Sequence, residues 1–364
     1  MLPLDSLGLL KSKAYATSPV RERILTSFRF RLKTGQDGLC ASTKLVTPLT
    51  GGCCASSQIM VLVREPRTSE EVSMDIGKLG IWFFLDAMSG PESAKFAQTV
   101  EKNGYKALWI PEAVGREPFP HAAYLLSQTE RLSIATGIAN IWARDPITMA
   151  AASKTVAELS GGRFVLGIGV SHKPLVANLR GHSYDKPYSY MKEYLPKMKN
   201  ALYRAPEPKE PVPIVIAALH PKMLALSAAE TQGTHTYFVP PEHTAKVRAQ
   251  IGPKPWICAA QAVILESDAT KARTMARQYM KTYVPRLPNY TNNLKALGYA
   301  DAEFENGCSD RLVDDIVAWG SETKIRDRID AHLKAGATHV CILPIRWDNE
   351  SLPDLRAVEV FAPR

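Results

Sequence analysis

From residue 80 almost to the C-terminus, short apolar runs alternate with segments in which apolar residues recur at helical spacing. The apolar runs lie at 81–85, 107–110, 132–137, 164–169, 213–216, 234–238, 256–265 and 339–343. Strands that alternate with helices pair in parallel, and eight such units close a TIM barrel. A chain of 364 residues is long enough for one barrel or for two domains, and the alternation favours a single α/β TIM barrel.

The connection between the seventh and eighth predicted strands is unusually long and runs from Pro285 to Asp310. In a compact domain, a connection of this length generally either covers a binding site or is mobile. We therefore expect this segment to matter for access to any site on the barrel.

The best-defined unit runs from Asp145 to Pro174 and reads as helix, turn, strand and loop. Asp145 is a natural N-cap, and Pro146 fits the first helical position, whose N–H has no partner within a helix. The face of this helix that we predict to be buried carries Met149, Ala152, Val156 and Leu159. The run Phe164–Gly169 lacks polar alternation, which is typical of a strand buried on both faces, and small and polar residues follow it. Such a strand end suits a ligand.

Composition and charge exclude several classes of protein. The formal net charge of +9 comes from basic residues spread along the chain, without a Lys/Arg block or a nucleic-acid-binding motif, so we expect no nucleic-acid partner. No apolar run reaches the length of about 18 residues that spans a bilayer, so we expect no membrane span. The six cysteines form no C-x-x-C pair, which predicts reduced thiols in a cytoplasmic protein and no metal site.

Residues 1–73 differ from the rest of the chain. They are rich in Ser, Thr, Arg and Lys and keep no regular apolar period, although the run 59–63 looks like a strand. This composition predicts a disordered or misassigned extension, with Met74 as the working start of a barrel domain at 74–364. A transit peptide remains an alternative, and the acidic residues Asp5, Glu22 and Asp37 count against it.

Ligands of TIM barrels sit at the C-terminal ends of the strands, so the residues after each strand are the candidate site. Gly167-x-Gly169-Val170-Ser171 offers close backbone approach, N–H donors and a hydroxyl, which suit a phosphate or a ring carbonyl. The run Ala217-Ala218-Leu219-His220 leads into a helix N-terminus, which favours an anion. Two such places on one rim predict a phosphorylated ligand.

A few side chains after these strands could carry chemistry. His172 and Glu112 are candidates for proton transfer, and each is otherwise an ordinary packing or surface residue. Trp142 and Arg144 follow the third strand and could wall a flat ring and hold an anion of the substrate. The sequence contains no G-x-S-x-G elbow, P-loop, H-E-x-x-H helix or G-x-G-x-x-G fingerprint, which disfavours the enzymes built on them.

Several motifs together resemble the luciferase-like monooxygenase superfamily, in particular its coenzyme F420-dependent oxidoreductase branch, from about Gly77 to Ile345. They are Arg144-Asp-Pro146, Leu159-Ser-Gly-Gly-Arg163, Phe164–Gly169, Pro213–Pro221, Gly233–Phe238, Leu287–Asn292 and Val317–Gly320. The resemblance implies a TIM barrel that binds coenzyme F420, or alternatively FMN, at the C-terminal rim and transfers a hydride at the ring. Relatives are often homodimers.

The resemblance also implies roles for individual positions. Gly137 and Ile138 match a bulge after the third strand that often has a non-proline cis peptide behind the ring. Val170 and Ser171, which follow the cofactor-binding candidate Gly169, match the segment that contacts the cofactor side chain. The residues that match the phosphate-binding turn are Ala217, Ala218, Leu219 and His220. His220 stands where related enzymes usually have glycine.

Three readings of function remain open from the sequence. The first is a hydride transfer between coenzyme F420 and a small organic substrate that enters between the Trp142 loop and the long connection. The second is an FMN-dependent monooxygenase. The third is a phosphate-binding barrel without redox chemistry, or a degenerate barrel without catalysis, although the absence of a Lys at the ends of strands five to seven argues against a Schiff-base aldolase.

Overall fold

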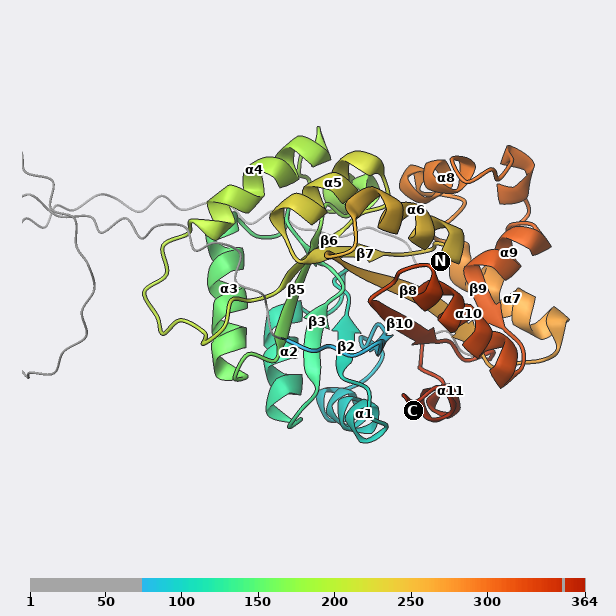
Figure 1. Cartoon of the computed structure of the whole chain (residues 1–364), viewed down its shortest axis with the longest axis horizontal. Coiled ribbons are helices and arrows are strands. Elements are labelled where there is room, and N and C mark those ends of the chain that lie inside the picture. Colours follow the sequence, from blue (N-terminus) through green and yellow to red (C-terminus); the bar gives the residue numbers. More distant parts are fainter. Residues whose placement is uncertain (1–73, 349–350, 364) are drawn as a thin grey trace, which may run out of the picture. The chain divides into compact units, whose positions relative to one another are not determined.

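The structure, a computed structural model, describes residues 74–348 and 351–363. Parallel strands form a closed barrel with helices around its outside (Figure 1). The predicted TIM barrel is therefore confirmed. The predicted extension at 1–73, with the strand-like run 59–63, lies outside the described residues, and the domain boundary at residue 74 stays a prediction.

The barrel strands follow the order β10-β1-β2-β3-β5-β6-β7-β8, and pairing of β8 with β10 closes the ring. Every pairing between these strands is parallel, as the alternation with helices predicts. The strands are β1 Leu79–Trp82, β2 Ala107–Ile110, β3 Ser133–Thr136, β4 Ala139–Asn140, β5 Phe164–Gly169, β6 Ile214–Ala217, β7 Gly233–Thr236, β8 Trp256–Ile264, β9 Val317–Trp319 and β10 His339–Pro344.

Helices connect successive strands and cover the outside of the barrel (Figure 1). They are α1 Gly90–Lys102, α2 Pro118–Ser127, α3 Pro146–Leu159, α4 Pro187–Lys199, α5 Pro221–Glu230, α6 Pro241–Ile251, α7 Ala269–Met280, α8 Pro288–Lys295, α9 Asp310–Ile316, α10 Glu322–Lys334 and α11 Leu355–Val360. A π-helix, Pro174–Leu179, follows β5, and a 3-10 helix, Asp301–Phe304, lies between α8 and α9.

The start of α3 follows the predicted capping, whereas its buried face differs in part. Asp145 Oδ1 accepts hydrogen bonds from the N–H groups of Ile147 and Thr148, at 2.9 and 3.1 Å. Met149 and Val156 are buried, but Leu159 is 70% exposed. Leu159 lies outside the buried stripe because the residues that actually face the barrel are Met149, Ala150, Ser153, Val156 and Ala157.

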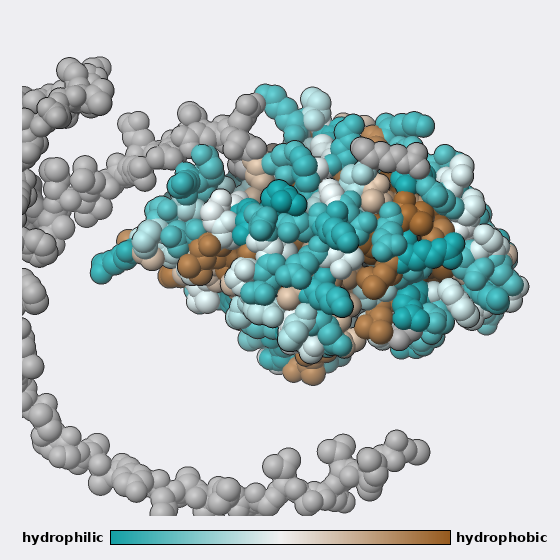
Figure 2. Space-filling model, turned by 90° about the horizontal axis from the view of Figure 1, so that it is seen from below, coloured by the Kyte–Doolittle hydropathy of each residue, from teal (hydrophilic) through white to brown (hydrophobic). Residues whose placement is uncertain are grey.

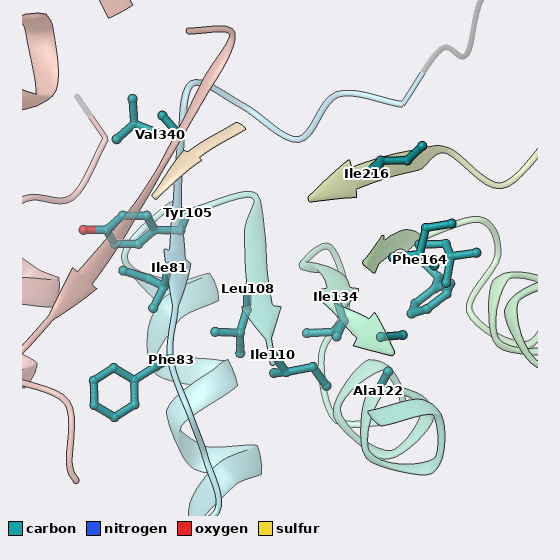
Figure 3. Close-up of a cluster of buried hydrophobic side chains, with 14 of the residues drawn as sticks. Ile81, Phe83, Tyr105, Leu108, Ile110, Ala122, Ile134, Phe164, Ile216 and Val340 are labelled. Atoms are coloured by element: carbon teal, nitrogen blue, oxygen red, sulfur yellow. The ribbon is translucent and has the colours of Figure 1, made fainter. Parts of the chain in front are cut away.

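Alternate residues of each strand pack on opposite sides of the barrel wall, as the period of a strand requires. Figure 3 shows the outer layer, in which Leu108, Ile110 and Ile134 on neighbouring strands pack with Ala122 of α2. The residue between the first two, Trp109, belongs to the other hydrophobic cluster. Burial of this outer layer fixes the helices against the barrel.

Trp109 is fully buried inside the barrel. Its ring stacks on His235 of β7, with 5.0 Å between ring centroids and an interplanar angle of 8°. Its Nε1–H can only donate, and it lies 3.1 Å from Nε2 of His339, whose Nδ1 lies 2.7 Å from the Gly77 carbonyl oxygen. His339 is therefore neutral, with the proton on Nδ1, in agreement with the burial that lowers its pKa to about 4.

The long connection after β8 is built of short structured pieces. It contains α8, the 3-10 helix and α9, and it ends in β9, which pairs with Ala262–Ile264 of β8. These pieces, and their packing against α7, make the connection a compact cap at the barrel end. Two residues of this connection, Asn289 and Tyr290, line a cavity at the strand ends.

The face drawn in Figure 2 is largely hydrophilic, and its hydrophobic atoms form separate patches. Large apolar side chains that are exposed include Val114, Ile147, Leu159, Leu179 and Leu202. Of the helices that the structure describes, none is long and apolar enough to cross a membrane.

Candidate functional site

A cavity of about 660 Å³ lies at the C-terminal ends of the barrel strands. Most of the predicted site residues line it, namely Glu112, Gly137, Ile138, Val170, Ser171, His172, Ala217, Ala218, Leu219 and His220. Gly169, Trp142 and Arg144 lie behind the wall, outside the set of described residues that line the cavity. The structure therefore brings the separate strand ends together into one site, as the barrel predicts.

One side of the cavity is made by the backbone that follows β3. The peptide bond between Gly137 and Ile138 is cis, as the resemblance implied. Its carbonyl oxygen on Gly137 accepts a hydrogen bond of 2.8 Å from Trp82 Nε1. A Cβ on Gly137 would lie 2.6 Å from the same nitrogen, so only glycine leaves room for this contact.

Two glycines of β5 stand behind this bond. A Cβ on Gly167 would lie 2.0 Å from the Thr136 carbonyl oxygen, and one on Gly169 would lie 2.8 Å from Ile138 Cδ1. Gly169 therefore makes space for the Ile138 side chain and does not itself reach the cavity. We call Gly137, Ile138, Gly167 and Gly169 the backbone wall.

The chain bends sharply where β5 ends, at Ser171. Ser171 has a φ of 54°, in the left-handed region, and its carbonyl oxygen accepts a 2.8 Å hydrogen bond from the Tyr184 hydroxyl. The bend presents His172 to the cavity, where its Nε2 lies 3.3 Å from the Tyr290 hydroxyl of α8. Burial lowers the pKa of His172 to about 4, so its imidazole is neutral near pH 7.

The turn after β6 leads into the N-terminus of α5 at the edge of the cavity. His220 is the N-cap residue, and no side-chain capping bond is formed by it. The Leu219 carbonyl oxygen lies 3.1 Å from Nε2 of His243, which fixes the turn against α6. Lys222, in the first turn of α5, also lines the cavity. A helix N-terminus with a cation beside it favours an anionic group.

Glu112 lies at the end of β2, between two arginines. Its Oε2 accepts hydrogen bonds of 2.8 Å from Arg144 Nη1 and from the Asn140 N–H, and its Oε1 lies 3.5 Å from Arg180 Nη2. Arg144 also pairs with Glu117. Oε2 of Glu112 thus accepts two hydrogen bonds from the protein, and Oε1 has only the longer ion-pair contact with Arg180. This network leaves the Arg144 side chain 9% exposed, beneath the rim.

The luciferase-like monooxygenase model matches residues 80–339, which is most of the chain. The chain belongs to this family. A relative from Mycobacterium tuberculosis, named "Putative coenzyme F420-dependent oxidoreductase Rv3520c", is 25% identical over 350 residues that cover 79% of this chain and 99% of the relative.

Solved structures with the same fold include members that hold either kind of ring cofactor. An F420-dependent secondary alcohol dehydrogenase in complex with an F420-acetone adduct has a TM-score of 0.64 at 15% identity, covering 78% of this chain and 97% of that one. A type II Baeyer-Villiger monooxygenase from Pseudomonas putida, in complex with FMN, has a TM-score of 0.56 at 15% identity, covering 78% and 96%. The chain is thus a luciferase-like oxidoreductase by family.

The residues of this family member fit a ring cofactor with an anionic tail. The backbone wall offers an uncharged surface on one side of the cavity, and the start of α5 with His220 and Lys222 offers an anion site. Among residues 74–348 and 351–363, no group of three or more His, Cys, Asp or Glu side chains is placed to hold a metal ion.

Trp142 lies behind the lining and supports it. Its ring stacks on Tyr190 of α4, with 4.0 Å between centroids and an angle of 11°, and its Nε1 donates a 3.0 Å hydrogen bond to the Val170 carbonyl oxygen. Trp142 therefore positions the strand end that carries Ser171 and His172. Trp142 and Arg144 were predicted to contact the substrate. In this structure they contact Val170 and Glu112, which line the cavity.

Sequence reasoning missed most of the aromatic lining. We call Trp82, Phe84, Tyr237, Tyr283 and Tyr290 the aromatic wall. Trp82 stacks on Tyr237 with 5.0 Å between centroids, and the Tyr237 and Tyr279 hydroxyls lie 2.6 Å apart. Trp82 and Tyr237 were within reach of prediction because they lie at strand ends. Tyr290 was not, since its place depends on how the long connection folds.

Proposed function

We propose that this chain is an oxidoreductase that exchanges a hydride between coenzyme F420 and a small organic substrate. The observation that carries the proposal is one cavity lined both by Gly137 and Ile138, which follow β3, and by the anion site at the start of α5, which follows β6. The names of the M. tuberculosis relative and of the alcohol dehydrogenase support F420 as the carrier. When bound, the deazaflavin ring supplies the hydride, and the residues of the protein supply position and proton transfer.

Several groups of the cavity have roles in this proposal. The backbone wall supports the ring from one side, and Trp82 holds the wall through the Gly137 carbonyl. His172, neutral and hydrogen-bonded to Tyr290, is the candidate for holding or moving a proton at its Nε2. Glu112 is a weaker candidate, because its carboxylate is held in ion pairs with Arg144 and Arg180 and its Oε2 already accepts two hydrogen bonds.

Fluorescence titration of the purified full-length protein with F420 and, separately, with FMN tests the proposal. We expect F420 to bind, and Lys222→Gln to weaken its binding about fivefold, since one charge contact at the start of α5 is lost. Lys246→Gln on α6, outside the cavity lining, is the matched control and leaves the affinity unchanged. Failure of both carriers to bind would sink the proposal.

The FMN-containing neighbour favours one second candidate, an FMN-dependent monooxygenase. Reduced flavin reacts with oxygen, whereas a deazaflavin lacks the ring nitrogen that this reaction needs. Oxygen uptake that depends on reduced FMN and on this protein would favour the monooxygenase. The degenerate alternative predicts instead that His220→Gly gains carrier affinity, because His220 stands where relatives usually have glycine.

A further inference from the structure

The charges around the cavity are confined to its two ends. At the end of β2, the Glu112 carboxylate is compensated by Arg144 and Arg180. At the start of α5, Lys222 lies beside His220, in the part that the proposed function assigns to the anionic tail of the carrier. A charged group on a substrate would therefore find no uncompensated partner among the described residues at the Glu112 end, and would compete with the carrier at the other.

Between these ends the lining is aromatic, and its polar atoms are largely engaged. The Tyr237 hydroxyl is bonded to Tyr279, and Nδ1 of His235 lies 3.0 Å from the Cys258 carbonyl oxygen. Tyr184 donates to Ser171. Burying a charge against such a wall is strongly unfavourable unless a counter-charge is present. The middle of the cavity therefore suits an uncharged molecule.

One polar pair faces the cavity from opposite elements. His172 comes from the end of β5 and Tyr290 from α8, with 3.3 Å between Nε2 and the hydroxyl oxygen. Burial lowers the pKa of His172 to about 4 and raises that of Tyr290, so both side chains are neutral near pH 7. Two neutral groups that can each donate or accept suit one uncharged oxygen, such as that of a carbonyl or an alcohol.

We propose that the substrate is a neutral, mostly apolar molecule with one hydrogen-bonding oxygen, which His172 and Tyr290 bind beside the aromatic wall. The cavity discriminates against carboxylates and phosphate esters of similar shape. The inference deepens the proposed function and rests on it in one respect, the assignment of the Lys222 end to the carrier.

Three probes of similar size test this inference on the full-length protein loaded with its carrier. They are acetophenone, toluene and benzoate, and their dissociation constants are measured by calorimetry or by ligand-observed NMR. We expect acetophenone to bind about fivefold more tightly than toluene, from one net hydrogen bond, and more than about tenfold more tightly than benzoate. Benzoate that binds as tightly as acetophenone would overturn the inference.

Tyr290→Phe tests the hydrogen-bonding pair while it keeps the aromatic ring. The preference for acetophenone over toluene falls to less than about twofold, and toluene affinity is unchanged. Tyr203→Phe is the matched control, because the Tyr203 hydroxyl contacts Thr155 on the outside of the barrel. A Tyr290→Phe variant that keeps the full preference shows that Tyr290 does not bind the oxygen. The comparison of probes on the unsubstituted protein stands even if this variant does not fold.

Failure of the proposed function is distinguished from failure of this inference by a separate arm. If neither F420 nor FMN binds, the three probes are measured on the carrier-free protein with Lys222→Gln, which removes the cation that would attract benzoate. A preference for acetophenone in that variant supports the substrate class without the proposed carrier. Equal binding of benzoate there overturns the substrate class as well.

Discussion

The two walls of the cavity are built in opposite ways. The backbone wall consists of peptide groups and glycines, in which a single added methyl group at Gly167 would overlap the Thr136 carbonyl. The aromatic wall consists of large rings from β1 and the residues after it, from the end of β7 and from the segment around α8. These rings contact one another at 5.0–6.4 Å between centroids, as Tyr237 and Tyr290 do at 6.2 Å. Trp82 belongs to the aromatic wall and bonds to the backbone wall.

The backbone wall therefore tolerates fewer substitutions than the aromatic wall does. A wall made of backbone atoms keeps its shape only if glycine is kept where neighbouring atoms approach closely, so its sequence is constrained position by position. A wall made of rings shares its packing among many contacts, so one substitution removes only part of it. We expect the carrier to be recognised by the first wall and the substrate by the second.

Substitution of Gly167, in the backbone wall, is expected to have the largest effect on stability. Gly167→Ala places a Cβ 2.0 Å from the Thr136 carbonyl oxygen, which is backbone of the neighbouring strand and cannot turn aside. We expect a loss of about 3 kcal/mol or more in the free energy of unfolding, measured by urea denaturation. Gly90→Ala is the control, since a Cβ there meets its nearest neighbour at 3.8 Å, and it costs nothing measurable. A loss below about 1 kcal/mol for Gly167→Ala would show that the backbone around Thr136 can shift to accommodate the added methyl group.

The dependence of stability on pH tests His235, a buried histidine of the cavity lining. Burial lowers the pKa of His235 to about 4 from its ordinary value of 6.5, so the unfolded chain binds a proton in this range that the folded chain does not. The stability that this histidine contributes is present above pH 6.5 and is lost as the pH falls through 4, by about 1.4 kcal/mol for each pH unit.

Urea unfolding at several values of pH between 4 and 7 measures this loss. His235→Gln lowers the slope of stability against pH by up to that amount, whatever it does to stability at pH 7. The backbone wall has no titratable side chain, whereas other buried histidines such as His339, and carboxylates with a lowered pKa such as Glu303, add to the total loss in acid. An unchanged slope in His235→Gln would contradict the neutral state that its contacts imply.

The smallest effect is expected in the aromatic wall. Tyr237→Phe leaves the Tyr279 hydroxyl without its 2.6 Å partner and costs about 1 kcal/mol in unfolding free energy. Tyr237→Phe with Tyr279→Phe removes both partners and costs less than the sum of the single changes. A double-mutant cycle in urea measures the difference. Strict additivity would show that the two hydroxyls act independently.

The sequence predicted the barrel, with its strands and helices, because these depend on local signals. The glycines of Phe164–Gly169, the N-cap at Asp145 and the order of strands are each readable from neighbouring residues. The cis bond at Gly137–Ile138 came from the family resemblance and is present. His172, Ser171 and the turn from Ala217 to His220 reach the cavity because their strands end there.

The aromatic wall and the arginine network depend on contacts between distant segments. Tyr290 meets His172 across 118 positions of sequence, which no spacing rule predicts. Arg144 was expected on the cavity surface, but the carboxylates of Glu112 and Glu117 hold it beneath. Pairing between oppositely charged residues from separate loops determines such positions, and a single sequence does not reveal the pairs.

The return of the long connection to β8 has a consequence for how this barrel can vary. The chain leaves β8 through α7 and comes back at β9 to pair with Ala262–Ile264 of the same strand. Because the segment from α7 to α9 starts and finishes beside one rigid strand, changing its length alters the entropy of loop closure only slowly. The segment can therefore change in length at little cost in folding free energy. Replacing it would remodel the side of the cavity that Tyr290 occupies, while the strands that carry Gly137 and Ala217 stay as they are.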